Sequence, residues 1–406
     1  MVVPLRRNRR FQLLWVGSAV SQLGTELTKF ALPFLVLALT GSPGWAGVVV
    51  GTRTAAFITA QLPAGIWVDR WDRRRTLLLS QGAQLVNAAV LALLIVLGGV
   101  ELWHLLVLGA VDGVCTAFGG PARTTAIRAV VPPDQLRGAY AQEEARGHAG
   151  RLVGPPLGAF LFGLGRALPF VVDVLTFLVS FLCSLFATVP RHPDTPRAAE
   201  RTSMRREAAD AVGWLWRQHG LRGVCFAVMA MNLLGGALLI PLIVLVGERG
   251  GDVLTTGVVY AGIGVGGLLG ALLSARIGGL LPAGRLLIAI LVLFGACNAA
   301  MVLPIAAWWP MIPLLITSLT TPTLNVVMNV AISRLVPEAM LGRLDALLTV
   351  VGMGLSPLAP VLGGVLAAEL GGAVAVLVLG VGFLLTALVA AASRDLREFT
   401  DDESTA

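Results

Sequence analysis

Several ionisable side chains lie inside long apolar segments of the sequence, and their types suit proton transfer or the binding of a charged solute. The clearest members of this group are Glu26, Lys29, Arg53, Asp112 and Asp173. A charged side chain costs about 3 kcal/mol at the centre of a membrane-spanning helix, so such residues usually have a function there. A carboxylate in this setting can take up and release a proton, and a cation can hold an anionic group or neutralise the acid.

Glu26 and Lys29 lie three residues apart and therefore share one face of a helix. At a rise of about 1.5 Å per residue, Glu26 and Arg53 reach similar depths in two consecutive helices. The spacing and the depth therefore allow Glu26 to form an ion pair with either Lys29 or Arg53. We expect proton coupling or substrate binding from Glu26, Lys29, Arg53 and Asp112. The alternative is a set of structural ion pairs, and Asp173 is expected to tie its helix to the preceding one.

The second half of the sequence carries amides and hydroxyls in place of these charges. Asn325 and Asn329 are four residues apart, so they share a helix face, with Thr321 on the same side. They are candidates for substrate contact. Hydrogen bonds that join neighbouring helices are an equally open interpretation.

Long apolar helices must position these residues, and the composition of the chain predicts such helices. The 406 residues are 56% hydrophobic and 13% charged, whereas soluble proteins are about 25% charged. The mean hydropathy is +0.83, and a helix crosses a bilayer in about 20 apolar residues. An all-α polytopic membrane protein with twelve transmembrane helices is expected. The twelve segments are 11–39, 45–68, 76–99, 102–124, 138–164, 168–189, 223–246, 255–276, 285–303, 308–331, 345–368 and 371–392.

Most of the 30 Lys and Arg residues fall in loops on one side of these segments. The loops of the opposite side contain Arg166 and Arg249. This asymmetry follows the positive-inside rule and predicts that both termini are cytoplasmic. The asymmetry also explains the net charge of +7 without a nucleic-acid partner. The 29 arginines against one lysine suggest a GC-rich bacterial genome and hence a bacterial cell membrane.

Residues 65–75 form a short, charged turn between two of the apolar segments. Its candidate gating residues are Gly65, Asp69, Arg70, Arg73 and Arg74. We expect Gly65 to permit close helix packing. Asp69 is expected to cap the preceding helix and to meet the positive end of a helix that begins near Asp345. The arginines are expected to bridge carboxylates on facing loops, such as Asp134 or Asp345. The alternative is a positively charged anchor without a gating role.

The spacing Gly-x-x-x-Asp-Arg-x-x-Arg-Arg in this turn resembles the loop between helices 2 and 3 of the major facilitator superfamily. Asp72 stands where that family usually has a second glycine. The resemblance extends over essentially the whole chain and implies two six-helix bundles that work by alternating access.

A glycine-rich stretch in the segment 138–164 resembles the antiporter motif of drug-efflux members of the superfamily. Its residues are Gly150, Gly154, Pro155 and Gly158, with Ala159 where a second glycine is common. Residues 118–123 and 30–33 resemble the branch that contains macrolide-efflux and enterobactin-exporter proteins. The arginine that many proton antiporters carry in helix 4 would fall near Gly109, which leaves Asp112 or Glu26 to carry the proton.

The two halves of the sequence also match each other weakly. A shift of 205 residues places Pro155 and Gly158 on Pro360 and Gly363. Two parallel six-helix repeats around a site near mid-membrane fit such a duplication. The expected parts are an N-terminal bundle, a cytoplasmic linker with an amphipathic helix, a C-terminal bundle and a cytoplasmic tail. Their ranges are 1–189, 190–222, 223–392 and 393–406.

Enzyme chemistry is not indicated, because the four histidines are scattered and the sequence has neither a paired metal-ligand pattern nor a phosphate-binding loop. No metal site and no cofactor are expected. The resemblance implies a monomeric secondary transporter that exports small amphiphilic or hydrophobic compounds by proton antiport. Such compounds include drugs, macrolide-like antibiotics and secondary metabolites. An exporter of siderophores or anionic metabolites is the alternative that Lys29 and Arg53 favour. A membrane-embedded sensor or enzyme is a more remote alternative.

Overall fold

The computed structural model describes residues 4–187, 213, 216–277, 281–335, 352–397 and 399. Within these ranges the chain is helical and contains no β-strand. It divides into two compact units, which we describe separately. Unit 1 comprises residues 1–195 and 251–261, and unit 2 comprises residues 196–250 and 262–406.

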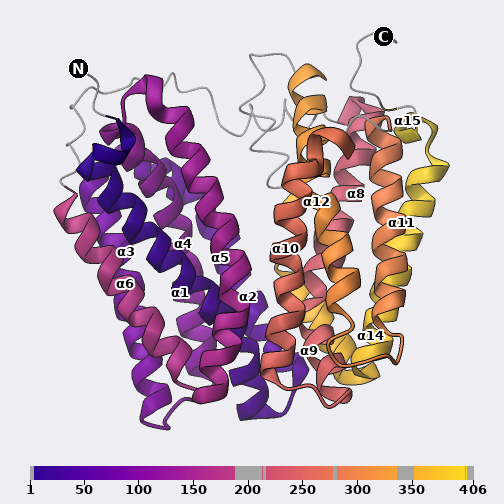
Figure 1. Ribbon diagram of the computed structural model, residues 1–406, viewed down its shortest axis with the longest axis horizontal. Coiled ribbons are helices and arrows are strands. Elements are labelled where there is room, and N and C mark those ends of the chain that lie inside the picture. The colour runs from indigo at the N-terminus through magenta and orange to yellow at the C-terminus, as the bar shows by residue number, and fades with distance from the viewer. Residues whose placement is uncertain are drawn as a thin grey trace. The chain divides into compact units, whose positions relative to one another are not determined.

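Unit 1 is a bundle of long helices in which α1 is central. The helices are α1 (Arg9–Thr40), α2 (Pro43–Arg70), α3 (Arg73–Val96), α4 (Leu102–Val130), α5 (Leu136–Leu164) and α6 (Leu168–Phe186). Helix α1 packs against α5 and α6, α2 packs against α4, and α3 packs against α4 and α6 (Figure 1). Local sequence sets the ends of α1. Asn8 accepts the N–H of Phe11, and Gly41 terminates the helix with a left-handed φ of 65°.

Unit 2 contains the remaining helices that the structure describes. They are α8 (His219–Ala237), α9 (Leu239–Glu248), α10 (Val253–Ile277), α11 (Ala283–Met301), α12 (Met311–Leu335), α14 (Leu358–Ala392) and the short α15 (Arg394–Arg397). The first residues of α10 belong to unit 1. Helix α14 packs against α8, α9 and α11, and its Phe383 is fully buried in the core of the unit.

Glycines bring α10 and α12 into close contact. A Cβ atom at Gly262 would lie 2.7 Å from the carbonyl oxygen of Met311, and Cβ atoms at Gly266 and Gly270 would overlap the carbonyl oxygens one and two turns further along α12. Small residues at four-residue spacing commonly allow helices to associate in lipid. The hydrophobic effect does not drive helices together there, so close packing of their backbones must do so.

Helix α14 breaks at Gly371, and the side chain of Glu248 caps its second half. Gly371 has φ 75° and ψ 170°, a left-handed backbone that favours glycine. The Glu248 carboxylate at the end of α9 accepts the N–H groups of Gly372 (2.7 Å) and Ala373 (3.3 Å). A carboxylate is favourable there because the free N–H groups give a helix N-terminus a partial positive charge.

Replacing Glu248 by alanine should therefore lower the free energy of unfolding by about 1–2 kcal/mol, the range expected for loss of a helix N-cap. The thermal unfolding midpoint of the protein in detergent micelles measures the effect. Glu369→Ala is the matched control, because Glu369 is an exposed residue of α14 two positions before Gly371. Equal midpoints for the two variants would contradict the capping role.

The expected all-α membrane architecture is confirmed. Among the described residues, nine helices are long and apolar enough to cross a membrane. They do not correspond one for one with the twelve predicted segments. The segments 345–368 and 371–392 are counted together as α14, in which two helical stretches are joined at the kink at Gly371. Helices α2 and α5 are not among the nine.

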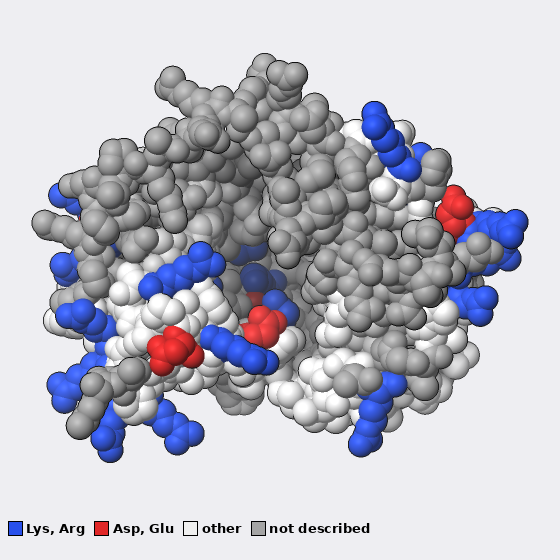
Figure 2. All heavy atoms as spheres, turned by 90° about the horizontal axis from the view of Figure 1, so that it is seen from above, with Lys and Arg blue, Asp and Glu red and all other residues white. Residues whose placement is uncertain are grey.

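Lys and Arg side chains lie on the described part of one end of each unit. Figure 2 views unit 1 from the end at which α1 begins and unit 2 from the end that carries α15, and several cationic side chains stand among uncharged residues there. The arrangement agrees with the charge asymmetry of the loops.

Candidate functional site

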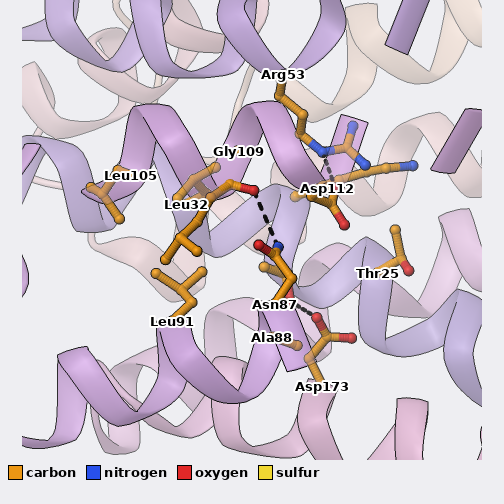
Figure 3. A pocket seen from close by; sticks show the side chains of 13 residues that line it. Thr25, Leu32, Arg53, Asn87, Ala88, Leu91, Leu105, Gly109, Asp112 and Asp173 are labelled. Carbon is orange, nitrogen blue, oxygen red and sulfur yellow. Dashed lines mark hydrogen bonds and ion pairs between the residues drawn. The ribbon is translucent and has the colours of Figure 1, made fainter. Parts of the chain in front are cut away.

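A small cavity with ionisable side chains in a largely apolar wall lies among five helices of unit 1. Its volume is about 50 Å³, and α1, α2, α3, α4 and α6 all contribute to its wall. Figure 3 shows its lining, in which apolar side chains such as Leu32 and Leu91 meet Arg53, Asp112 and Asp173. With Lys29, which also lines it, the cavity therefore joins four of the ionisable residues that the sequence singled out.

The ion pair at this cavity is Arg53 with Asp112. The Nε atom of Arg53 on α2 donates to Oδ2 of Asp112 on α4 at 2.6 Å, with both side chains mostly buried. Gly113 makes this possible, because a Cβ atom there would lie 2.9 Å from the backbone nitrogen of Phe57 and would overlap the carbonyl oxygen of Arg53. The alternative of a Glu26–Arg53 pair is thus wrong, because Arg53 forms its ion pair with Asp112 on α4.

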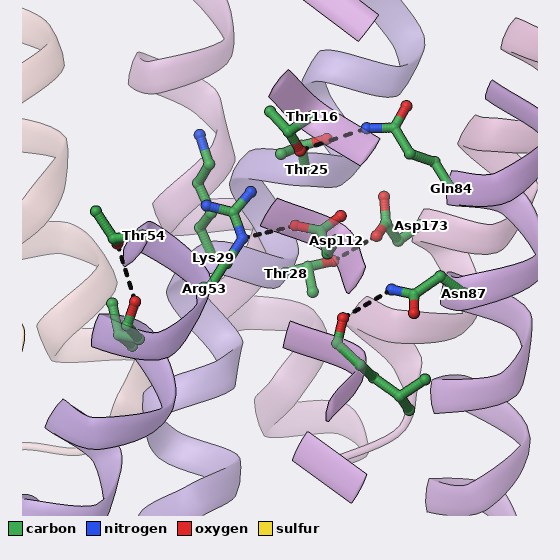
Figure 4. A network of polar contacts seen from close by, with 12 residues as sticks. Thr25, Thr28, Lys29, Arg53, Thr54, Gln84, Asn87, Asp112, Thr116 and Asp173 are labelled. Atoms are coloured by element: carbon green, nitrogen blue, oxygen red, sulfur yellow. Dashed lines mark hydrogen bonds and ion pairs between the residues drawn. The ribbon is translucent and has the colours of Figure 1, made fainter. Parts of the chain in front are cut away.

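Glu26 forms the alternative pair within α1. Its Oε1 accepts from Lys29 Nζ at 2.8 Å and from Gln22 Nε2 at 2.9 Å. The Glu26 side chain is mostly buried, whereas that of Lys29 is 40% exposed. The predicted Glu26–Lys29 pair is confirmed. Lys29 also lines the cavity, together with Arg53 and Asp112 (Figure 4).

The glycine motif of α5 packs directly against Glu26. A Cβ atom at Gly154 would overlap the Cβ of Glu26, and one at Gly158 would lie 3.0 Å from the carbonyl oxygen of Leu27. At Gly150 the neighbour is the side chain of Gln22, at 3.0 Å. The motif therefore brings α5 close to the face of α1 that carries the Glu26 carboxylate, a relation that the motif by itself does not reveal.

Replacing Gly154 by alanine should impair transport and lower stability, because the added methyl group must displace the backbone of α1 beside Glu26. Overpacking of this kind costs about 1–3 kcal/mol. Gly147→Ala is the matched control in the same helix, where nothing lies within 4 Å of the added carbon. There the higher helix propensity of alanine should raise stability by up to about 1 kcal/mol. Opposite shifts of the thermal midpoint in micelles are expected, and shifts of the same sign would contradict this packing.

Asp173 on α6 binds α1 through hydroxyl groups. It accepts from Thr28 Oγ1 at 2.8 Å and from Thr176 Oγ1 at 3.3 Å, and the residue is 5% exposed. The prediction that Asp173 ties α6 to α5 is wrong, since its partner outside α6 lies on α1. Gly24 opens the space for this contact, because a Cβ atom there would overlap Asp173 and Thr176.

Two buried polar atoms beside the cavity have no hydrogen-bond partner among the described residues. They are Nη2 of Arg53 and Oδ1 of Asn87, whose Nδ2 donates to the carbonyl oxygen of Leu108 at 3.1 Å. Leaving such atoms unpaired costs about 1–3 kcal/mol each. The volume of the cavity, about 50 Å³, exceeds the roughly 10–15 Å³ that one water molecule requires. The cavity can thus hold water that joins a donor and an acceptor on different helices.

Sequence reasoning missed Asn87 and Thr28 at this site. Asn87 and Gln84 interrupt the apolar segment 76–99, and Gln84 Nε2 approaches Thr116 Oγ1 at 3.4 Å (Figure 4). Polar residues inside a predicted membrane helix are the signal that could have identified them. Nothing in the sequence indicates that Thr28 faces Asp173.

A second charged cluster, which sequence reasoning also missed, joins α4 and α5 with α1. Glu143 accepts from Arg146 at 2.9 Å and lies 3.5 Å from Arg123. Arg146 also donates to the carbonyl oxygen of Ser18 at 3.0 Å. The spacing of Glu143 and Arg146, three residues apart on a helix, was the available signal.

The charged turn between α2 and α3 is described in part. Asp72 accepts the N–H of Arg75 at 2.8 Å and so caps α3, which gives this departure from the family pattern a local role. Arg74 Nη2 donates to the carbonyl oxygen of Leu185 at 3.2 Å. Gly65 has nothing within 4 Å of an added Cβ, so the expected close packing at this glycine is wrong for the described residues.

Other candidate residues lie outside the described set. The side chains of Asp69, Arg70, Arg73 and Asn329 are among them, as is all of Asp345. Asn325 on α12 is exposed, and its neighbour Thr321 donates to the carbonyl oxygen of Thr317 at 3.5 Å. The gating roles and the joint role of the two asparagines therefore stay predictions.

Comparisons with known proteins agree with this architecture. Residues 14–344 match the model of the Major Facilitator Superfamily. Macrolide efflux protein A of Streptococcus pyogenes is 24% identical over 55% of each chain, so the chain spans about half the length of that relative. The multidrug efflux pump Tap of Mycolicibacterium fortuitum is 23% identical over 95% of this chain and 96% of its own.

Two further similarities concern an exporter and a solved structure. The enterobactin exporter EntS of Shigella flexneri is 23% identical over 85% of this chain and 82% of its own. The inward-facing, occupied structure of a bacterial homologue of the human lysosomal transporter Spinster is similar with a TM-score of 0.71. It covers 96% of both chains at 16% identity, which supports the fold alone.

Proposed function

Because the chain belongs to the Major Facilitator Superfamily, we propose that it exports small amphiphilic or hydrophobic compounds in exchange for protons. It is a transporter rather than an enzyme, and a multi-pass membrane protein. The proposal includes proton antiport and the class of substrate. It also includes a location in the bacterial cytoplasmic membrane, cytoplasmic termini and a monomeric state.

The observation that carries the proposal is the position of Glu26. Its carboxylate is mostly buried inside a membrane helix, lies against the glycine motif of α5 and pairs with a half-exposed lysine. A partner that is partly exposed can release the carboxylate with a small change in free energy, since exposed ion pairs contribute about 0–1 kcal/mol. Glu26 is therefore the carboxylate that we propose as the proton carrier.

Export as the direction of transport rests on two supports. The first is the resemblance of Gly150, Gly154, Pro155 and Gly158 to the antiporter motif of drug exporters. The second is that the relatives named above are efflux pumps and an exporter. Drugs, macrolide-like antibiotics and secondary metabolites are amphiphilic, as a solute that enters a largely apolar helical bundle must be.

A second candidate substrate class is anionic, for example a siderophore. The side chain of Lys29 is 40% exposed, and Nη2 of Arg53 has no partner among the described residues. The similarity to an enterobactin exporter favours the same class.

Transport assays in proteoliposomes separate these possibilities. The purified protein should export macrolides, cationic dyes or a catechol siderophore only when a pH gradient drives protons in the opposite direction, and transport should move protons in step with the solute. Movement of solute and protons in the same direction would overturn antiport. Preference for the siderophore would select the anionic class.

A further inference from the structure

A groove on the outside of unit 2 lies between the start of α8 and the end of α14. Its volume is about 620 Å³, within the range of sites that bind small organic molecules. Among the residues that line it are Trp216, Arg222, Phe226, Leu385, Val389 and Asp395. None of these belongs to the site in unit 1, so the groove is a separate feature.

The wall of the groove is apolar and open to the surroundings of the protein. Phe226 is 48% exposed, Leu385 is 56% exposed and Val389 is 73% exposed. These residues lie on helices that qualify as membrane spans, α8 and α14. Exposed apolar side chains on such helices face hydrocarbon chains of the bilayer, so the long part of the groove suits an acyl chain.

One end of the groove is cationic and aromatic. The guanidinium of Arg222 lies over the ring of Trp216, 5.5 Å from its centre, and that ring meets Phe226 edge-on at 6.2 Å. No described carboxylate forms an ion pair with Arg222. Arg217 follows Trp216 in the chain and is exposed, whereas Asp395 is the acid that lines the groove. Arg217 does not line the groove itself, but as the neighbour of Trp216 in the chain it adds positive charge near the end at which Arg222 and Asp395 lie.

We propose that this groove binds one anionic phospholipid from the leaflet at the α15 end of unit 2. The positive-inside charge distribution predicts that this leaflet is the cytoplasmic one. The headgroup phosphate binds the Arg222 guanidinium, which presents planar N–H donors matched to phosphate oxygens. Trp216 lies at the boundary between headgroups and hydrocarbon, as tryptophans of membrane proteins commonly do. The acyl chain packs along Phe226, Leu385 and Val389.

The charge balance favours an anionic lipid over a zwitterionic one. An ethanolamine or choline group would bring a third cation near Arg222 and Arg217, and Asp395 is the one carboxylate among the described residues that line the groove. Phosphatidylglycerol adds no cation, and its hydroxyl groups can donate to the Asp395 carboxylate. Basic sites at the ends of membrane helices are known to bind anionic headgroups on this principle. The inference depends on membrane insertion and not on the transported substrate.

The test is native mass spectrometry of the full chain, released from detergent micelles after titration with phosphatidylglycerol. Arg222→Gln should weaken binding about fivefold, the effect of one cation near a headgroup. Arg285→Gln is the matched control, since Arg285 is an exposed arginine at the start of α11 in the same unit and does not line the groove. Its affinity for the lipid should equal that of the unchanged protein.

A second variant tests the apolar part of the groove without altering charge. Val389→Trp replaces a highly exposed side chain, so folding should be retained, and the ring fills the space for the acyl chain. It should also reduce phosphatidylglycerol binding and abolish the rise in thermal midpoint that the lipid produces. Equal binding by Arg222→Gln and the unchanged protein would overturn the proposal. So would binding of phosphatidylcholine or phosphatidylethanolamine as tight as that of phosphatidylglycerol.

Discussion

Glu26→Gln will abolish proton-coupled export and leave membrane insertion and folding intact. Glutamine has almost the same shape as glutamate and can still bond to Gln22, but it binds no proton in the physiological range. The pair with Lys29 is partly exposed, so its loss should change the free energy of unfolding by about 1 kcal/mol or less. Transport driven by a pH gradient should fall to the level of empty vesicles.

Purified protein in proteoliposomes provides the measurement, with a fluorescent substrate and an internal pH indicator. Glu144→Gln is the matched control, because Glu144 lies on α5 with its side chain 78% exposed. That variant should export at the normal rate. Full proton-driven export by Glu26→Gln would remove Glu26 from the coupling mechanism, and loss of export in both variants would point to damage unrelated to coupling.

Removing one partner of the Arg53–Asp112 pair should cost more than removing both. Asp112→Asn leaves a mostly buried guanidinium without its counter-ion, and breaking a buried pair in this way costs about 3 kcal/mol or more. The double variant Arg53→Gln with Asp112→Asn places two neutral amides in the same space. We expect it to recover a large part of the stability that the single variant loses, as a double-mutant cycle of thermal midpoints would measure.

Transport by the same variants distinguishes a structural pair from a coupling pair. If Asp112 exchanges protons, the stable double variant will lack coupled export even though it folds. If the pair only joins α2 to α4, the double variant will export at close to the normal rate. Additive losses of stability in the two single variants and the double variant would contradict the pairing itself.

Part of the site was predictable because it depends on helix geometry alone. Glu26 and Lys29 are three residues apart, and any α-helix brings such residues onto one face, so this pair follows from spacing. The same is true of the contact between Glu143 and Arg146. The caps at Asn8 and Asp72 are likewise local, since each side chain reaches a backbone N–H three residues away.

The sequence by itself predicted the all-α membrane architecture and the charges that its apolar segments carry. Only the tertiary structure decided which charges meet. Arg53 meets Asp112 because Gly113 lets α2 and α4 touch, and Asp173 meets Thr28 because Gly24 leaves room between α1 and α6. Hydropathy sets the depth of a residue through the rise of the helix. In lipid it does not set the rotation of that helix about its axis, because every apolar face is equally well solvated by acyl chains. Close packing at small residues and hydrogen bonds between helices set that rotation, and both require the partner helix to be in place.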